Sequence, residues 1–291
     1  MRWGRVQLEN GEESAAVLVD DERVIALRAV NQRLGYRFPL DLDAIIRCGA
    51  VVDIAEALND AARQRRLSEP LASFQVLSPL KAPERIVGIG LNYRQHAEDL
   101  GAALPSEPAT FLKPLNTLIG PGDSIRLPAA AQLVTAEAEL ALVFGRSAKN
   151  VSPDEWRAVI FGAVPVLDMT AEDILKQNPR FLTRAKGFDT FFSSGPWIVT
   201  LDELPDLSTL IIRTIVNQQV RAEDAVGGMV YGIDQLVAWV TRGVSVGPTA
   251  VLSTGTPGAW PIQAGDQVTA AIDGLGRLTN PVVDDAGSEG G

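Results

Sequence analysis

The chain is poor in cysteine, histidine and basic residues. It holds one cysteine, Cys48, and one histidine, His96, in 291 residues. A single cysteine excludes an intramolecular disulfide and any zinc or iron–sulfur site built from several cysteines. A single histidine excludes every mechanism that needs two. The 26 lysines and arginines are outnumbered by 36 acidic residues, giving a net charge of −10. Such a surface would repel a phosphate backbone, so we expect no nucleic-acid partner.

Long apolar runs are also absent. The longest uncharged stretch, residues 243–265, is broken by glycine and proline and is rich in serine and threonine. It predicts turns and strands rather than a membrane span. The first six residues contain no apolar run, which predicts the absence of a secretory signal. We therefore expect a cytoplasmic protein with no membrane partner.

Composition and turn signals predict two unequal domains. Hydrophobic residues make up 46% of the chain, which is enough for a substantial core. We assign residues 1–76 to a small N-terminal α+β domain, 77–283 to a catalytic domain and 284–291 to a disordered tail. Residues 77–83 form the linker, with two prolines that favour extended backbone. In the N-terminal domain the expected strands are 5–8, 15–19 and 23–27, and one or two helices are expected within 43–66, with a possible break at Gly49.

Beyond residue 86 the pattern changes to short strands rich in Val, Ile and Leu, separated by Gly and Pro turns. Few helices are expected, and no regular alternation of strands and helices occurs. The pattern predicts a mixed, β-rich α+β fold rather than a doubly wound sheet. The expected strands are 86–89, 110–113, 140–144, 163–167, 197–199, 210–216, 250–253, 267–272 and 276–279.

Three carboxylates on strand-like segments are candidate metal ligands. Glu137 and Glu139 stand two apart, so on a strand both side chains point to the same face. Asp168 follows the apolar run 164–167 and would lie at the mouth of a buried strand, where an unpaired charge is costly. The glutamates by themselves also fit a solvated strand edge. Together with Asp168 they favour a site for Mg²⁺ or Mn²⁺ that leaves room for water and substrate.

His96 is a candidate general base. Gly88 and Gly90, which precede it, mark the place where a strand ends and a turn begins. Glu98 and Asp99 lie within one helical turn, and a carboxylate beside the imidazole would raise its basicity and fix its tautomer. A lone histidine is often structural or solvated, but this setting suits a base that deprotonates water.

Two lysines and one turn are candidate binders of anionic oxygen. Lys113 and Lys186 stand in apolar or turn surroundings. Each is either a surface lysine or a group that binds a carboxylate or stabilises an oxyanion. The turn 252–258 follows a strand and carries hydroxyls and backbone N–H groups that can hold an anionic oxygen.

An ordered series of short motifs runs from about residue 84 to 283. Any one motif is weak, but the ordered set is specific, and in it the chain resembles the fumarylacetoacetate hydrolase family. The matching pieces are Gly90-Leu91-Asn92-Tyr93 with His96, Phe111-Leu112-Lys113-Pro114, Leu118-Ile119-Gly120-Pro121-Gly122-Asp123, Glu137-Ala138-Glu139-Leu140, Leu167-Asp168-Met169-Thr170-Ala171 with Asp173, Lys186-Gly187-Phe188-Asp189-Thr190, Gly195-Pro196-Trp197 and Thr254-Gly255-Thr256-Pro257.

The resemblance implies a mixed β-roll core and a homodimer. It implies Mg²⁺, Mn²⁺ or Ca²⁺ on Glu137, Glu139 and Asp168, and a small β-dicarbonyl or 2-oxo acid as substrate. By the same likeness His96 and Asp99 would form a base dyad and Lys186 would assist at the substrate oxygen. The residues that would bind substrate are Asn92, Tyr93, Lys113 and Thr256.

The chain also departs from the family pattern. Glu172 stands where members commonly have arginine, and Leu175 where they commonly have glutamine. If Glu172 faces the cleft, it would repel a second carboxylate, and Leu175 would offer apolar surface. We therefore expect a less acidic, more apolar substrate than fumarylpyruvate. The alternative is that Glu172 points to solvent or pairs with Arg184, without bearing on the substrate.

We expect a metal-dependent hydrolase that cleaves a C–C bond in an acylpyruvate-like acid. His96 would activate water while the cation polarises the carbonyl. A tautomerase, isomerase, decarboxylase or dehydratase would use the same metal and the same base, so these activities stay open. A less favoured alternative is a non-catalytic binding protein with the same fold.

Overall fold

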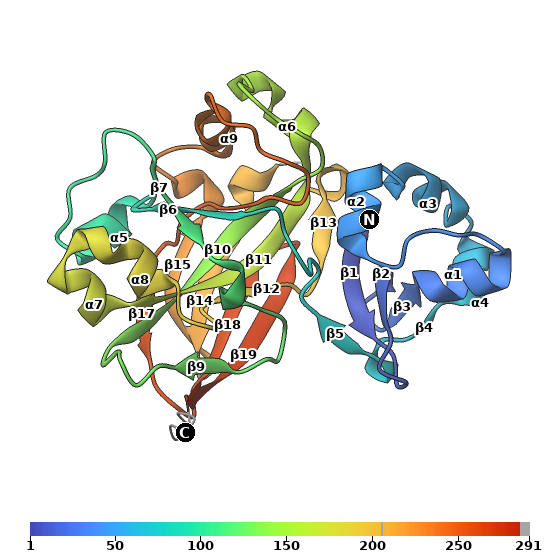
Figure 1. Cartoon of the computed structure of the whole chain (residues 1–291), viewed down its shortest axis with the longest axis horizontal. Coiled ribbons are helices and arrows are strands. Elements are labelled where there is room, and N and C mark those ends of the chain that lie inside the picture. Colours follow the sequence, from blue (N-terminus) through green and yellow to red (C-terminus); the bar gives the residue numbers. More distant parts are fainter. Residues whose placement is uncertain (205, 286–291) are drawn as a thin grey trace.

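The computed structural model describes residues 1–204 and 206–285, which form two β-sheets with short helices around them (Figure 1). The strand-rich α+β fold predicted from the sequence is confirmed. Within these two described ranges, no helix is long and apolar enough to cross a membrane.

The larger sheet is mixed and includes strands from both predicted domains. Its strands are β1 (Arg2–Gln7), β2 (Glu13–Asp20), β3 (Arg23–Ala26), β4 (Glu69–Pro70), β5 (Gln75–Leu77), β6 (Ile86–Gly90), β7 (Ala109–Lys113), β8 (Leu118–Ile119), β10 (Val134–Phe144), β11 (Ile160–Ala171), β12 (Phe192–Ser194), β13 (Ile198–Thr200), β16 (Val251–Ser253) and β17 (Ala259–Ile262). The main path runs β4-β3-β2-β1-β13-β11-β10-β16-β6-β7, and β5, β8, β12 and β17 pair beside it.

The smaller sheet packs against the middle of the larger one. It has the order β15-β14-β18-β19-β9, with β9 (Ile125–Leu127), β14 (Ile211–Val216), β15 (Gln219–Ala225), β18 (Gln267–Ile272) and β19 (Gly276–Asp284). Strands β14, β18 and β19 contact β10 and β11, which lie near the centre of the molecule in Figure 1. The main apolar core fills the space between these strands.

The helices are short and lie at the edges of the sheets. Helices α5, α7 and α8 lie together on one side of the sheets, and α1–α4 lie on the opposite side (Figure 1). Their bounds are α1 (Leu27–Leu34), α2 (Leu42–Cys48), α3 (Val51–Ala57), α4 (Ala61–Leu67), α5 (Arg94–Asp99), α6 (Trp156–Val159), α7 (Glu172–Gln177), α8 (Leu182–Lys186) and α9 (Ile233–Thr241).

Strand β10 is buried along its whole length because its two faces meet different layers. Leu140 and Leu142 belong to the core between the sheets. Ala141 and Val143 alternate with them and pack in a second core with the N-terminal strands and helices. The face of Ala141 and Val143 continues backward to Glu139. The acids therefore extend the strand, which begins at Val134 rather than at the expected residue 140.

The N-terminal region is joined to the rest by strand pairing. Arg2 of β1 pairs with Val199 of β13, and Trp3 pairs with Ile198, so the sheet continues across the predicted boundary at residue 76. The segment expected to hold one or two helices holds α2, α3 and α4. Gly49 ends α2 in the left-handed conformation (φ 75°), which glycine adopts without strain.

The predicted tail, 284–291, overlaps the smaller sheet at its first residues. Asp284 is the last residue of β19, and the N–H of Asp285 donates to the Leu127 carbonyl at 2.9 Å. These two residues are therefore part of the folded structure. The rest of that prediction, residues 286–291, lies outside the described residues.

Candidate active site

Strand register brings the three predicted acids together. Glu137 and Asp168 stand opposite each other in the antiparallel pair of β10 and β11, and Glu139 follows on the same face of β10. Each offers a carboxylate oxygen, and these oxygens all lie within 4.8 Å of one another. All three side chains are buried. The convergence expected from the two-residue spacing is therefore seen.

Glu139 is held by the turn that follows β16. Its Oε2 accepts a hydrogen bond from Ser253 Oγ and another from the Gly255 N–H at 2.9 Å. The turn expected to hold an anionic oxygen thus binds a carboxylate of the protein itself. Gly255 has φ +98°, and a Cβ there would lie 2.8 Å from Asn92 Cβ, so glycine is required.

Asn92 supports this turn. Its Nδ2 donates to the Thr254 carbonyl at 2.8 Å and to the Tyr231 carbonyl at 3.2 Å, and its Oδ1 accepts from the Tyr231 N–H at 2.9 Å. The side chain is buried and its hydrogen-bonding groups are used by backbone. Asn92 therefore acts on the site through the turn that carries Gly255.

Two buried lysines pair with the acids. Lys186 Nζ donates to Asp168 Oδ2 at 2.7 Å, to Thr170 Oγ1 at 2.7 Å and to Glu137 Oε2 at 3.2 Å. Lys113 Nζ donates to the other oxygen of Asp168 at 2.5 Å and to the Met169 carbonyl at 3.2 Å. Neither lysine is a surface residue. Each provides positive charge that offsets the cost of burying the carboxylates.

The electrostatics of the cluster follow from burial and pairing. Burial, together with the charges of Asp168 and Glu137, raises the pKa of Glu139 to about 8. Burial would also raise the pKa of Asp168, but Lys113 and Lys186 outweigh it and hold that pKa below its usual range. Burial lowers the pKa of Lys113 to about 8 despite its pairing with Asp168. The acids and lysines are thus strongly coupled charges in a medium of low polarity.

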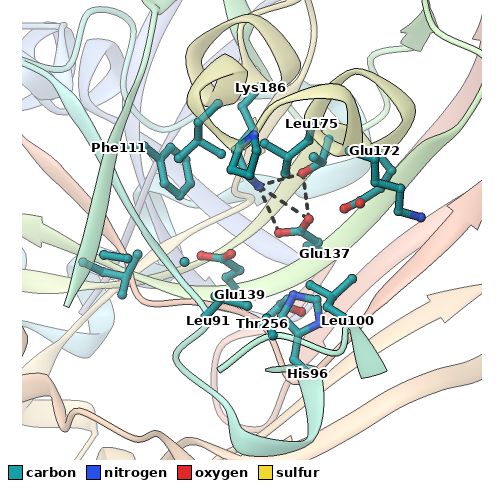
Figure 2. A pocket seen from close by; sticks show the side chains of 18 residues that line it. Leu91, His96, Leu100, Phe111, Glu137, Glu139, Glu172, Leu175, Lys186 and Thr256 are labelled. Carbon is teal, nitrogen blue, oxygen red and sulfur yellow. Dashed lines mark hydrogen bonds and ion pairs between the residues drawn. The ribbon is translucent and has the colours of Figure 1, made fainter. Parts of the chain in front are cut away.

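His96 lies on the opposite side of the acids from Lys186. Figure 2 shows Glu137 and Glu139 between these two side chains. Burial lowers the pKa of His96, and Lys186 acts in the same direction, while Glu137 and Asp99 partly offset the effect. The lowered pKa favours the neutral imidazole, which is the form that accepts a proton.

Asp99 does not take the position in the site that the base dyad with His96, implied by the family resemblance, would require. It is exposed at the end of α5, and its Oδ1 accepts a hydrogen bond from Gln95 Nε2 at 2.9 Å. Its partner for hydrogen bonding in the described structure is thus Gln95 rather than His96. Asp99 influences His96 only as a nearby charge.

Glu137, Glu139 and His96 face one cavity of about 370 Å³. Glu172, Leu175 and Thr256 also line it, as expected for residues that contact substrate (Figure 2). The cavity is not lined by three residues that were predicted to bind substrate, namely Asn92, Tyr93 and Lys113. Tyr93 is fully buried and its hydroxyl has no hydrogen-bond partner within the described structure. The complete lining is Ile89, Gly90, Leu91, His96, Leu100, Ala102, Ala109, Phe111, Glu137, Glu139, Thr170, Glu172, Leu175, Lys176, Pro179, Leu182, Lys186 and Thr256.

Sequence reasoning missed several residues that shape the site. Thr170 donates to Glu137 Oε1 at 2.7 Å, and its spacing of two from Asp168 on β11 was a usable signal. Phe111 lines the cavity with its ring centroid 4.9 Å from Lys186 Nζ. A Cβ at Gly88 would lie 2.2 Å from that ring, so Gly88 makes room for it. No local pattern indicated this contact between neighbouring strands.

The donor set fits a hard divalent cation. Such cations prefer oxygen ligands, and three carboxylates converge here from two paired strands. The two buried lysines show that this place already stabilises positive charge. Because Glu137 and Glu139 also face the cavity, a cation on the acids would be open to substrate on that side.

Comparisons with known proteins show the family to which the chain belongs. The family model described as Fumarylacetoacetate (FAA) hydrolase C-terminal matches residues 85–283. The mitochondrial oxaloacetate tautomerase fahd2 of Xenopus laevis is 35% identical over 221 residues, which is 73% of this chain and 69% of that protein.

Solved structures of similar proteins cover nearly the whole chain, and two of them illustrate the range of activities. One is a 5-carboxymethyl-2-hydroxymuconate delta-isomerase from Mycobacterium smegmatis, with a TM-score of 0.78 and 33% identity over 98% of this chain and 100% of that one. The other is a maleylpyruvate hydrolase from Sphingobium sp. SYK-6 in complex with manganese(II) and pyruvate, with a TM-score of 0.80 and 26% identity over 98% and 99%. This chain belongs to the fumarylacetoacetate hydrolase family, an enzyme family that includes hydrolases, isomerases and tautomerases.

Proposed function

We propose that this protein is a metal-dependent hydrolase that cleaves a C–C bond in an acylpyruvate-like acid. The observation that carries the proposal is the cavity itself, which is lined by His96, Glu137 and Glu139, with Asp168 completing the acid cluster beside it. The manganese and pyruvate in the related maleylpyruvate hydrolase support this choice of chemistry.

The division of labour follows from the positions of the side chains. A divalent cation held by the three acids would act as a Lewis acid toward the substrate carbonyl. His96 takes a proton from water, which then adds to the carbonyl carbon, and the adjacent C–C bond breaks. The same imidazole returns the proton to the carbon that leaves. Lys186 lines the cavity and supplies positive charge at the substrate oxygen.

A second candidate uses the same groups for proton transfer alone. The tautomerase from Xenopus laevis and the delta-isomerase from Mycobacterium smegmatis favour it, because both are close in sequence to this chain. In that case His96 would move a proton between carbon and oxygen without adding water. A decarboxylase or dehydratase would also fit the same cation and base, and a binding protein would keep the cavity without turnover.

Product analysis in ¹⁸O-labelled water separates these candidates. Hydrolysis of an acylpyruvate should give two acids, one of which carries the label in its carboxylate. Purified protein with Mg²⁺ or Mn²⁺ is the test sample, and the His96→Ala variant is the control for spontaneous breakdown. Turnover of a 2-oxo acid without label or cleavage would instead identify a proton-transfer enzyme.

The physiological form is part of the proposal. We propose a homodimer that works in the cytoplasm with Mg²⁺ or Mn²⁺, and a small N-terminal domain, residues 1–76, that supports the catalytic domain. Light scattering after size-exclusion chromatography would give the mass, and metal analysis of protein purified without chelators would give the cation.

A further inference from the structure

We propose that Glu172 and the apolar wall beside it select monocarboxylate substrates with an uncharged tail and reject dicarboxylates. This inference rests on the proposed function, since it names the substrate class of the same cavity.

Glu172 is placed so that its carboxylate faces the cavity. It is the first residue of α7, and its N–H donates to the Leu133 carbonyl at 2.8 Å, which anchors the start of the helix. The residue is only 6% exposed, and it lines the cavity (Figure 2). A ligand in the cavity would therefore meet this carboxylate with little water between them.

The carboxylate of Glu172 has no hydrogen bond or ion pair within the described structure. Three cations lie in this region, and none of them forms an ion pair with Glu172 within the described residues. Arg184 lies over the Phe181 ring, 5.9 Å from its centroid, and Lys186 is bonded to the acid cluster. Lys176, four residues further along α7, also lines the cavity and acts on Glu172 as a nearby charge, but it is exposed to solvent, which screens it. Glu172 would thus repel a substrate carboxylate that arrives near it. The two lysines offset this repulsion only in part, because Lys186 is paired with the acid cluster and Lys176 is screened.

The charge balance of the site points the same way. The three clustered acids and Glu172 bring four carboxylates to the site, and Lys113, Lys186 and a divalent cation would balance them, while the remaining lining cation, Lys176, is exposed to solvent. A substrate with one carboxylate can bind beside the cation. A second carboxylate would add an uncompensated charge in a buried place, which is costly.

The walls of the cavity suit an alkyl chain. Seven of the lining residues are apolar and larger than alanine, and a cavity of about 370 Å³ leaves space beyond a pyruvate-sized head group. Leu175 lies one helical turn from Glu172 on α7 and continues this wall. The seven residues are Ile89, Leu91, Leu100, Phe111, Leu175, Pro179 and Leu182.

The test compares two acylpyruvates of matched chain length, one ending in a methyl group and one in a carboxylate. For the unmodified protein we expect kcat/KM to be at least roughly tenfold higher for the methyl-ended acid. Glu172→Gln keeps the shape and removes the charge, so it should shift the ratio toward the diacid by roughly tenfold and leave bound metal unchanged. Glu107→Gln removes an exposed charge from the loop between α5 and β7 and should leave the ratio unchanged.

A binding measurement keeps the two proposals separate. The same two acids are titrated calorimetrically into metal-loaded His96→Ala, with and without Glu172→Gln, so that no turnover is needed. Tighter binding of the methyl-ended acid, relaxed by Glu172→Gln, supports the inference even if the unmodified protein hydrolyses neither acid. An unchanged ratio in Glu172→Gln, a preference for the diacid, or loss of metal on this substitution overturns it, whether or not hydrolysis occurs.

Discussion

Buried acids occur in two regions of this molecule and are used in different ways. Asp43 in the N-terminal region and Asp168 in the active site are each 1% exposed. The oxygens of Asp43 accept backbone N–H bonds from the linker, at 2.8 Å from Lys81 and 3.3 Å from Ala82. The oxygens of Asp168 accept from the Nζ atoms of Lys113 and Lys186 at 2.5 and 2.7 Å.

The difference shows that burial of an acid does not by itself identify a site. Backbone N–H groups satisfy Asp43 with fixed dipoles and tie the linker to α2, which is a structural task. Asp168 is instead satisfied by the charges of two lysine side chains, and it belongs to a cluster whose other two acids face the cavity. A carboxylate whose charge is balanced by a lysine can be balanced by a metal ion instead.

The largest effect is expected when one of the clustered acids is removed. Glu139→Ala should abolish metal binding and lower kcat by about 10³-fold or more, because Lewis-acid assistance is lost. Metal analysis and circular dichroism on the same sample would separate loss of metal from loss of fold. A variant that keeps its metal and its activity would remove the functional half of the comparison.

His96→Ala should keep the metal and lower turnover by about 10²–10⁴-fold, since a general base typically contributes that much. Steady-state rates with saturating Mg²⁺ provide the measurement, and metal content provides the control. Near-normal turnover would mean that another group is the base, and Lys186 would be the next candidate.

Asp43→Ala tests the structural half of the comparison. Two backbone donors lose their acceptor, so the free energy of unfolding should fall by about 1–3 kcal/mol while kcat of the remaining folded protein is unchanged. Urea denaturation gives the stability. Asp53→Ala on the exposed face of α3 is the matched control and should have little effect. A loss of metal in Asp43→Ala would contradict the division between the two regions.

Metal uptake should depend on pH through Glu139. Its pKa of about 8 in the metal-free protein means that the carboxyl is largely protonated at pH 7, whereas a cation requires the carboxylate. Metal binding should therefore release a proton, and the Kd should rise by about tenfold for each pH unit below 8. Calorimetry in buffers of different ionisation enthalpy measures this release, and an absence of proton release at pH 7 would be the contrary result.

The smallest effect is expected at Asp99. It is exposed and hydrogen-bonded to Gln95, so its influence on His96 is screened by solvent. Asp99→Asn should lower kcat by less than about threefold. A loss comparable to that of His96→Ala would show that α5 rearranges on substrate binding so that the two side chains pair.

Much of the site could be predicted from the sequence because the geometry of a strand is local. The two-residue spacing of Glu137 and Glu139 puts both on one face of β10 wherever the strand lies. The placement of Asp168 after an apolar run marked it as a buried acid that needs a partner. The ordered motifs added the family, and the departures at Glu172 and Leu175 identified two residues that do line the cavity.

Only the tertiary structure decided how distant residues divide the work. Lys113 reaches Asp168 across 55 positions of sequence, and Ser253 reaches Glu139 across 114. Asn92 proved to support the Gly255 turn, and Asp99 proved to face solvent. Residue type and spacing determine which chemistry a chain can perform and on which face of a strand the reactive side chains lie. Which partner satisfies each buried group depends on long-range packing, because strands far apart in sequence become neighbours only when the sheets form.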